Sequence, residues 1–316
     1  MVEISAFVEK LKKFNKFAIV CHTRPDGDAV GSARALKYAL DKVGKTATVF
    51  CDDDIPEKFA NITDISVFKK EITGEFEAFI AVDCADEMRM GNLAMDFLRH
   101  KNTFNIDHHV SNTRYAKNNL IINNSSNCEN IYNVAVALGA KIDSDLANAL
   151  LLGISTDTGN FSHKDLTQSA FVVAGELVAN GGDINKIYYD TFKKQSKQKA
   201  MLFTRVNSKI RYMLDDRLAI SIISQNDLKE TGALINDTEG IIDFVLSIDG
   251  VEVAVSILEV GFEKYKISLR GKNTNVNAIA SVYGGGGHVL ASGCMIMGSL
   301  EEVIDRLSYT VSQHLD

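Results

Sequence analysis

Four groups of aspartate and histidine constrain the fold of this chain more than any other feature, because each group follows an apolar run. The groups are His22 with Asp26 and Asp28, then Asp83, then Asp107-His108-His109, and finally Asp157. The apolar runs, which are typical of strands or buried helices, are residues 17–21, 78–82, 103–106 and 146–154. An α/β sheet exposes such side chains together at one functional edge. Carboxylates that converge repel one another unless a cation neutralises them, so a metal centre is the simplest expectation.

The sequence around these groups predicts an α/β fold for the first half of the chain. Short β-rich runs alternate with amphipathic helical segments, a pattern that is typical of βαβ units and a parallel sheet. The predicted strands are residues 17–22, 47–50, 79–82 and 103–106. The predicted helices are residues 30–43, 130–138, 146–153 and 169–180.

The length of 316 residues indicates two domains, because a single core usually stops growing at roughly 250–300 residues. Residues 193–209 are polar and rich in lysine, a composition that a solvated helix face explains best and that also fits a helix between domains. The elements predicted beyond them are strands 218–223, 251–258 and 265–270, helices 275–282 and 300–307, and a flexible glycine loop at 284–288. We therefore predict a first domain at residues 1–190, a linker helix at 191–204, and a smaller α+β domain at 205–316.

Charge and composition narrow the classes of partner. A net charge of −7 and a pI near 5.6 lack the basic footprint of a protein that grips long nucleic acid, whereas a local cluster could hold a small phosphorylated ligand. The five cysteines are scattered without a C-x-x-C pair, which argues against disulfides and a structural zinc site. We expect a cytoplasmic protein without a membrane partner, because neither a signal peptide nor a transmembrane run is present. A homodimer is also possible from the sequence.

The residue types in the four groups suit a pair of divalent ions. Histidine with aspartate is a ligand mixture for Mn²⁺, Zn²⁺ or Fe²⁺, and Asp26 and Asp28 could face neighbouring ions from one turn. Two metals about 3.5–4 Å apart commonly assist the attack of water on a phosphate ester. Each group alone also has a structural interpretation: a helix cap at Asp26 or Asp83, a turn at Asp157, or a satisfied histidine at His22. The ordered set of four favours the metal interpretation.

These motifs resemble those of the DHH family of phosphoesterases. The stretch from His22 to Ser32 is similar to the first family motif, Val82-Asp83 to the second, Asp107-His108-His109 to the third, and residues 153–159 to the fourth. The resemblance implies two metal ions, with manganese favoured. It assigns one ion to His22, Asp26 and Asp83, and the other to Asp28, Asp83, His108 and Asp157. It further implies that His109 acts as a general acid or phosphate contact, and that Asp107 orients a histidine.

The second domain resembles the DHH-associated substrate-binding domain, which implies an active site in the cleft between the domains. The residues that carry this resemblance are Arg270, Asn277, Gly285, Gly286, Gly287 and His288. An arginine offers a planar fork for phosphate, and glycines let backbone N–H groups approach an anion, although a glycine loop can also be a plain mobile loop. Gly271 departs from the family pattern, because many members carry serine there.

Within the family, a stand-alone pair of these domains resembles enzymes that hydrolyse short oligoribonucleotides and remove the 3′-phosphate from adenosine 3′,5′-bisphosphate. The expected partner is therefore one of these small substrates and no long nucleic acid. A phosphodiesterase of linear or cyclic diadenylate is a close alternative that the sequence does not separate. An inorganic pyrophosphatase, a long-strand exonuclease and a non-catalytic nucleotide-binding module fit less well, since the ligand set is complete and the second domain lacks the pyrophosphatase motif.

Overall fold

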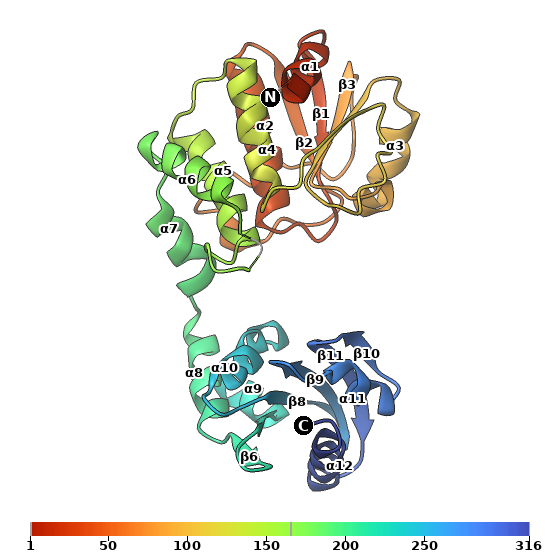
Figure 1. The fold of residues 1–316 in the computed structure, drawn as a ribbon, viewed down its shortest axis with the longest axis vertical. Coiled ribbons are helices and arrows are strands. Elements are labelled where there is room, and N and C mark those ends of the chain that lie inside the picture. The colour runs from red at the N-terminus through yellow and green to blue at the C-terminus, as the bar shows by residue number, and fades with distance from the viewer. Residues whose placement is uncertain (1, 165, 316) are drawn as a thin grey trace. The chain divides into compact units, whose positions relative to one another are not determined.

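The computed structural model describes residues 2–164 and 166–315, which form two compact units with the boundary between Lys194 and Gln195 (Figure 1). The first unit contains α1 (Val2–Leu11), β1 (Lys16–Val20), α2 (Gly27–Lys42), β2 (Thr46–Phe50), η1 (Glu57–Phe59), β3 (Ala78–Val82), η2 (Glu87–Leu93), α3 (Ala94–Arg99), β4 (Thr103–Asp107), β5 (Asn118–Ile121), α4 (Asn127–Leu138), α5 (Ser144–Asp157), α6 (Gln168–Ala179), α7 (Ile184–Tyr188) and η3 (Tyr189–Lys193). The second contains α8 (Lys197–Asn207), β6 (Arg211–Met213), β7 (Leu218–Ile223), α9 (Gln225–Thr231), η4 (Ile235–Thr238), α10 (Ile241–Ser247), β8 (Val253–Gly261), β9 (Lys264–Gly271), α11 (Val276–Val282), β10 (Gly286–His288), β11 (Ala291–Met297) and α12 (Leu300–Ser312).

The first unit is built on a parallel sheet with the strand order β2-β1-β3-β4-β5. The neighbouring strands β1 and β3 are nearly continuous apolar runs, because helices cover both faces of the sheet. Helices α1, α2, α4 and α5 pack on one side, and η2 with α3 on the other. The chain leaves β1 for the β2 edge and returns to the opposite side at β3. Ligands of such sheets bind at the carboxyl ends of strands where the order reverses, which here means the ends of β1 and β3.

Two glycines allow helices α2 and α5 to touch behind this edge. A Cβ atom on Gly31 would lie 2.4 Å from the carbonyl oxygen of Ala149, and one on Gly153 would lie 2.4 Å from Oδ1 of Asp28. Any side chain at these two positions would therefore push the helices apart. The close contact brings the end of α5, with Asp157, to the first turn of α2, where Asp28 lies.

The second unit has a mixed sheet with the order β10-β11-β9-β8-β7-β6, in which only β7 and β8 pair in parallel. Helices α11 and α12 cover one face, and α8, α9 and α10 pack over β7 and β8 on the other. The predicted α/β architecture, with a parallel first sheet and a separate domain that has its own sheet, is confirmed. In the described part of the chain, no helix is long and apolar enough to cross a membrane.

One local prediction differs from the structure. The flexible loop predicted at residues 284–288 is wrong for its second half, because Gly286–His288 forms β10 and pairs with β11. The glycines permit this pairing: a Cβ atom on Gly285 would lie 2.2 Å from the carbonyl oxygen of Gly293. Near the boundary between the units, Tyr189–Lys193 belongs to the first unit and α8 packs into the second.

Candidate metal centre

The carboxyl edge of the first sheet gathers all six predicted metal ligands. His22 follows β1, Asp83 follows β3, and His108 follows β4. The others come from helix ends: Asp26 caps α2, Asp28 lies in its first turn, and Asp157 ends α5. Their ligand atoms fall into overlapping groups whose members lie within 4.8 Å of one another: His22, Asp26 and Asp83; Asp28, His108 and Asp157; and Asp83, Asp107, His108 and His109.

Two histidines present the same ring nitrogen to these carboxylates. Nδ1 of His22 donates to the carbonyl of Thr23 at 2.8 Å, and Nδ1 of His108 donates to the carbonyl of Asn124 at 3.0 Å. These hydrogen bonds fix the tautomer and leave Nε2 of each ring as the ligand atom. Nε2 of His22 lies 3.6 Å from both Asp26 and Asp83, and Nε2 of His108 lies 3.4 Å from both Asp83 and Asp157.

Asp83 lies between the two histidines in a strained position. Its backbone has a φ of +57°, in the left-handed region that costs about 1–3 kcal/mol for most residues, although aspartate tolerates it better than most. The side chain is only 3% exposed, and its Oδ1 atom is buried without a hydrogen-bond partner. A buried carboxylate oxygen that lacks a partner is costly, and a cation would satisfy it. The site therefore fits divalent ions, with Asp83 placed to contact both groups of ligands.

The pKa values of the aspartates and histidines in this cluster also indicate a site for cations. Burial and the neighbouring charges of Asp28 and Asp83 raise the pKa of Asp157 to about 10, and burial with the charge of Asp83 raises that of Asp28 to about 6. Burial lowers the pKa of His22 and His108, but the facing carboxylates outweigh it and raise both to about 10. The carboxylates thus compete for protons, and divalent ions would take the place of those protons.

Proton release is therefore expected when a divalent ion binds. At pH 7 Asp157, His22 and His108 hold protons that they must lose to become ligands, so the affinity for Mn²⁺ should rise as pH rises and fall as pH falls. Calorimetric titration in two buffers with different ionisation enthalpies measures the protons released. Binding at pH 7 with no release would contradict this assignment.

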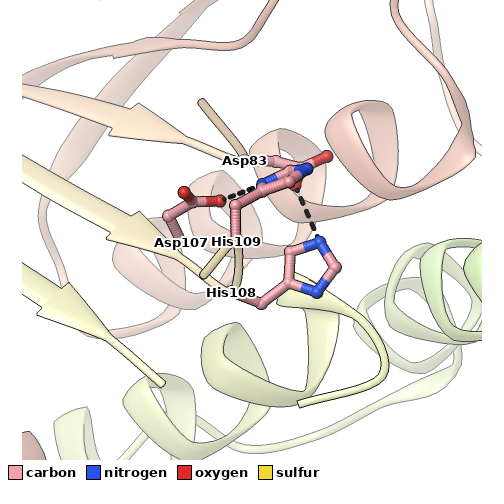
Figure 2. Close-up of side chains that lie close together, drawn as sticks. All are labelled: Asp83, Asp107, His108 and His109. Carbon is pink, nitrogen blue, oxygen red and sulfur yellow. Dashed lines mark hydrogen bonds and ion pairs between the residues drawn. The ribbon is translucent and has the colours of Figure 1, made fainter. Parts of the chain in front are cut away.

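His109 differs from its neighbour in the direction of its ring. Its Nδ1 donates to Oδ1 of the fully buried Asp107 at 2.8 Å, whereas His108 points towards Asp83 (Figure 2). The His109 side chain is 38% exposed, so Nε2 remains available to a ligand. The hydrogen bond that His109 donates to Asp107 raises the pKa of His109, although partial burial opposes it. Such a ring is suited to deliver a proton.

Comparison with known protein families identifies two domains in this chain. Residues 16–154 match the model of the DHH family, N-terminal domain, and residues 215–315 match the DHHA1 domain. The chain therefore carries a DHH N-terminal domain followed by a DHHA1 domain.

Relatives of this protein match the chain over almost its whole length. It is 29% identical to the probable bifunctional oligoribonuclease and PAP phosphatase NrnA of Streptococcus mutans, over 93% of each chain. It is 26% identical to the bifunctional oligoribonuclease and PAP phosphatase NrnA of Thermus thermophilus, over 94% of this chain and 89% of the relative. A solved exopolyphosphatase-related protein of Bacteroides fragilis shares the fold, with a TM-score of 0.81 at 23% identity over 99% of this chain and 96% of that one.

The DHHA1 domain places its predicted substrate residues on or beside the sheet. Strand pairing aligns His288 with Ala291 and Ala291 with Arg270, so His288 and Arg270 share one face about 10 Å apart, two strand spacings. Asn277 lies on α11, and its Oδ1 atom would be 3.7 Å from a Cβ atom on Gly286. Gly285 precedes β10, and Gly287 lies within it.

Two sets of residues that contact the candidate site residues were not predicted from the sequence. Asp28 accepts hydrogen bonds from Ser126 Oγ at 2.9 Å and from the backbone N–H groups of Asn127 and Cys128 at 2.6 and 3.0 Å. The N-terminus of α4 therefore holds this carboxylate, as helix N-termini hold anions. The serine N-cap ahead of an apolar helix marks the helix start in the sequence, but nothing there indicates which anion it meets.

The second set centres on Asn112. Its Nδ2 donates to Oδ2 of Asp107 at 2.6 Å and to the carbonyl of Cys84 at 3.1 Å. It therefore ties the carboxylate that holds His109 to the strained turn after Asp83. The same Cys84 carbonyl also accepts from Asn105 and Tyr115, each at 3.1 Å.

Replacing Asn112 by leucine is expected to lower turnover by about 10–100-fold, the usual effect of removing a group that orients a catalytic or ligand side chain. Tyr115→Phe is the matched control, because it removes a donor from the same carbonyl but leaves Asp107 untouched. We expect a much smaller loss in that variant, measured as kcat with metal content determined alongside. Equal losses in both variants would show that Asn112 matters through the turn alone.

Proposed function

We propose that this chain is a two-metal phosphoesterase that hydrolyses short oligoribonucleotides to mononucleotides and adenosine 3′,5′-bisphosphate to AMP. The observation that carries the proposal is the gathering of six ligand-type side chains beside His109, which Asp107 orients. The relatives named oligoribonuclease and PAP phosphatase support the substrate class, since they match over nine-tenths of the chain.

The roles proposed for individual residues follow from this arrangement. His22, Asp26 and Asp83 would hold one ion and Asp28, His108, Asp157 and Asp83 the other, with manganese favoured by the mixture of imidazole and carboxylate ligands. Such ions supply an activated water and neutralise phosphoryl oxygens. As a water oxygen bonds to phosphorus and the P–O bond to the leaving group breaks, Nε2 of His109 would give its proton to the leaving oxygen. Before this transfer, Asp107 would stabilise the imidazolium form of His109. In the second domain, Arg270, Asn277, His288 and residues 285–287 would contact the substrate.

A panel of phosphoesters with Mn²⁺ tests the substrate class. It comprises adenosine 3′,5′-bisphosphate, dinucleotides to pentanucleotides, linear and cyclic diadenylate, and pyrophosphate. The highest kcat/KM values are expected for the bisphosphate and the short oligoribonucleotides. A higher value for diadenylate or for pyrophosphate would replace this proposal with the corresponding alternative.

Catalytic efficiency is also expected to fall with strand length. Long single strands are usually held by an extended basic groove with aromatic stacking platforms, whereas this chain has a net charge of −7 and no tryptophan. Extra phosphates would therefore meet a negative surface without compensation. The measurement compares kcat/KM for a dinucleotide, a pentanucleotide and a 24-nucleotide strand at fixed salt. Equal or rising efficiency on the longest strand would favour a processive exonuclease.

A further inference from the structure

One face of the second sheet is covered only over part of its width. Helices α8, α9 and α10 pack over β7 and β8 through buried apolar residues such as Ile223, Val245 and Leu258. The same face of β9 carries Lys266, Ser268 and Arg270, which are exposed or half-buried. These three alternate along the strand, so their side chains project about 7 Å apart in a row. Apolar side chains over β7 and β8 therefore meet basic side chains of β9 at the border between the covered and uncovered parts of this face.

A cavity of about 410 Å³ lies at this border. Its apolar part is formed by Ile223, Ile242 and Leu258, none of which is more than 8% exposed. Its polar part includes two basic residues, Lys266 and Arg270, two acidic residues, Glu239 and Asp243, and the neutral residues Asn236, Thr238, Ser256 and Ser268. The volume is within the range of about 300–1,000 Å³ that is usual for small-molecule sites.

A second cavity of about 380 Å³ adjoins the first along β9. The two share Lys266 and Ser268, and the second reaches Gly285 and Gly293 at the β10–β11 end of the sheet. Backbone N–H groups become accessible near glycines, so the second cavity and the basic row suit an anion. The first cavity suits a flat, partly apolar group attached to that anion.

We propose that the first cavity binds the adenine base of a nucleotide, with the attached phosphate beside Lys266 and Arg270; this inference rests on the proposed function and names the part of the substrate that the second domain holds. The apolar residues would contact the face of the ring. Asp243 would accept a hydrogen bond from the exocyclic amine, which adenine has and uracil lacks. Asp243 also lies 3.7 Å from Nε of Arg270, so base and phosphate contacts adjoin.

Other ligand classes fit this lining less well. A purely apolar ligand would bury Lys266 and Arg270 against a surface that cannot pair with them, which is costly. A polyphosphate chain would leave Ile242 and Leu258 unused and would bring several anionic groups, where a nucleotide brings one phosphate, to a cavity that already holds the carboxylates of Glu239 and Asp243. A nucleotide uses both kinds of surface, because its base is flat and partly apolar and its phosphate is anionic.

Binding of AMP to the full chain in excess EDTA tests the proposal independently of the metal centre. Amide NMR spectra of isotope-labelled protein would follow residues 235–243 and 266–270 during titrations with AMP, UMP and inorganic phosphate. We expect saturable shifts in these segments at submillimolar AMP, and at least fivefold weaker binding of UMP. Asp243→Asn should remove most of the preference for AMP, whereas Asp305→Asn, exposed on α12 at the opposite face, should keep it.

Ser256→Leu provides a second variant that fills the cavity floor opposite Ser268. It should weaken AMP binding at least tenfold without changing the uptake of Mn²⁺. Equal wild-type affinities for AMP and UMP, or shifts confined to residues outside the cavity, would overturn the inference even if the enzyme hydrolyses oligoribonucleotides. Conversely, an AMP-specific cavity in a protein that hydrolyses no phosphoester would leave this inference standing and remove the proposed function.

Discussion

Replacing Asp83 by asparagine is expected to remove both metal ions and to lower turnover by about 10³-fold or more, since metal ions supply several kcal/mol of stabilisation in such reactions. Asp83 is the residue that joins the two ligand groups, with its oxygens 3.6 Å from Nε2 of His22 and 3.4 Å from Nε2 of His108. Asparagine keeps the shape and tolerates the backbone φ of +57°, so the change removes the charge while retaining the geometry.

Metal content of the purified variant, measured by elemental analysis together with kcat, checks this prediction. Asp145→Asn is a matched control, because this exposed aspartate lies in the first turn of α5, at the end of the helix opposite Asp157. The control should bind two ions per chain and retain full activity. An Asp83→Asn protein that still held two ions would exclude the bridging role.

Replacing His109 by alanine is expected to lower kcat by about 10²–10⁴-fold while leaving metal content unchanged, which is the usual effect of losing a general acid. The reason is the direction of its ring, which bonds to Asp107 through Nδ1 and leaves Nε2 free. His108→Ala provides the contrast, because Nε2 of that histidine faces Asp28, Asp83 and Asp157. That variant should lose metal. If His109→Ala lost the metal instead, the two histidines would exchange roles.

The pH dependence of kcat in the wild-type enzyme is a second test of His109 as the general acid. Its pKa is raised by the hydrogen bond with Asp107, so the ring keeps its proton to a higher pH than an ordinary histidine. An acid must hold that proton, and kcat should therefore fall as pH rises through this pKa. The alanine variant should lack this fall. A descending limb that persisted unchanged in the variant would assign it to another group.

The fold and the location of the site could be predicted because both depend on contiguous apolar runs. Two of the strands precede His22 and Asp83, and a third ends at Asp107. Each has five residues and is buried apart from Lys16, and their ends meet by the geometry of a parallel sheet. Asp157 follows the predicted helix at residues 146–153, and it lies at the end of α5.

Other parts depend on contacts between segments that have no pattern of their own. The glycines of β10 leave no alternation of apolar and polar side chains from which to predict a strand. Asn112 is one of several polar residues in a loop, and only the folded structure shows that it reaches both Asp107 and Cys84. The donors at the start of α4 meet Asp28 from about 100 positions away in sequence.

The wide spacing of the six ligand-type residues bears on how the protein folds. His22 and Asp157 are 135 positions apart, and the intervening ligands come from segments that must each be placed by the sheet or by α2 and α5. Closing such long loops is slow compared with forming local turns, so a nascent chain that ends before α5 would hold only a partial set of ligands. A complete set, and with it tight ion capture, arises only when the last helix docks. The ions would then bind only after the native state has formed, so they would slow unfolding more than they speed folding.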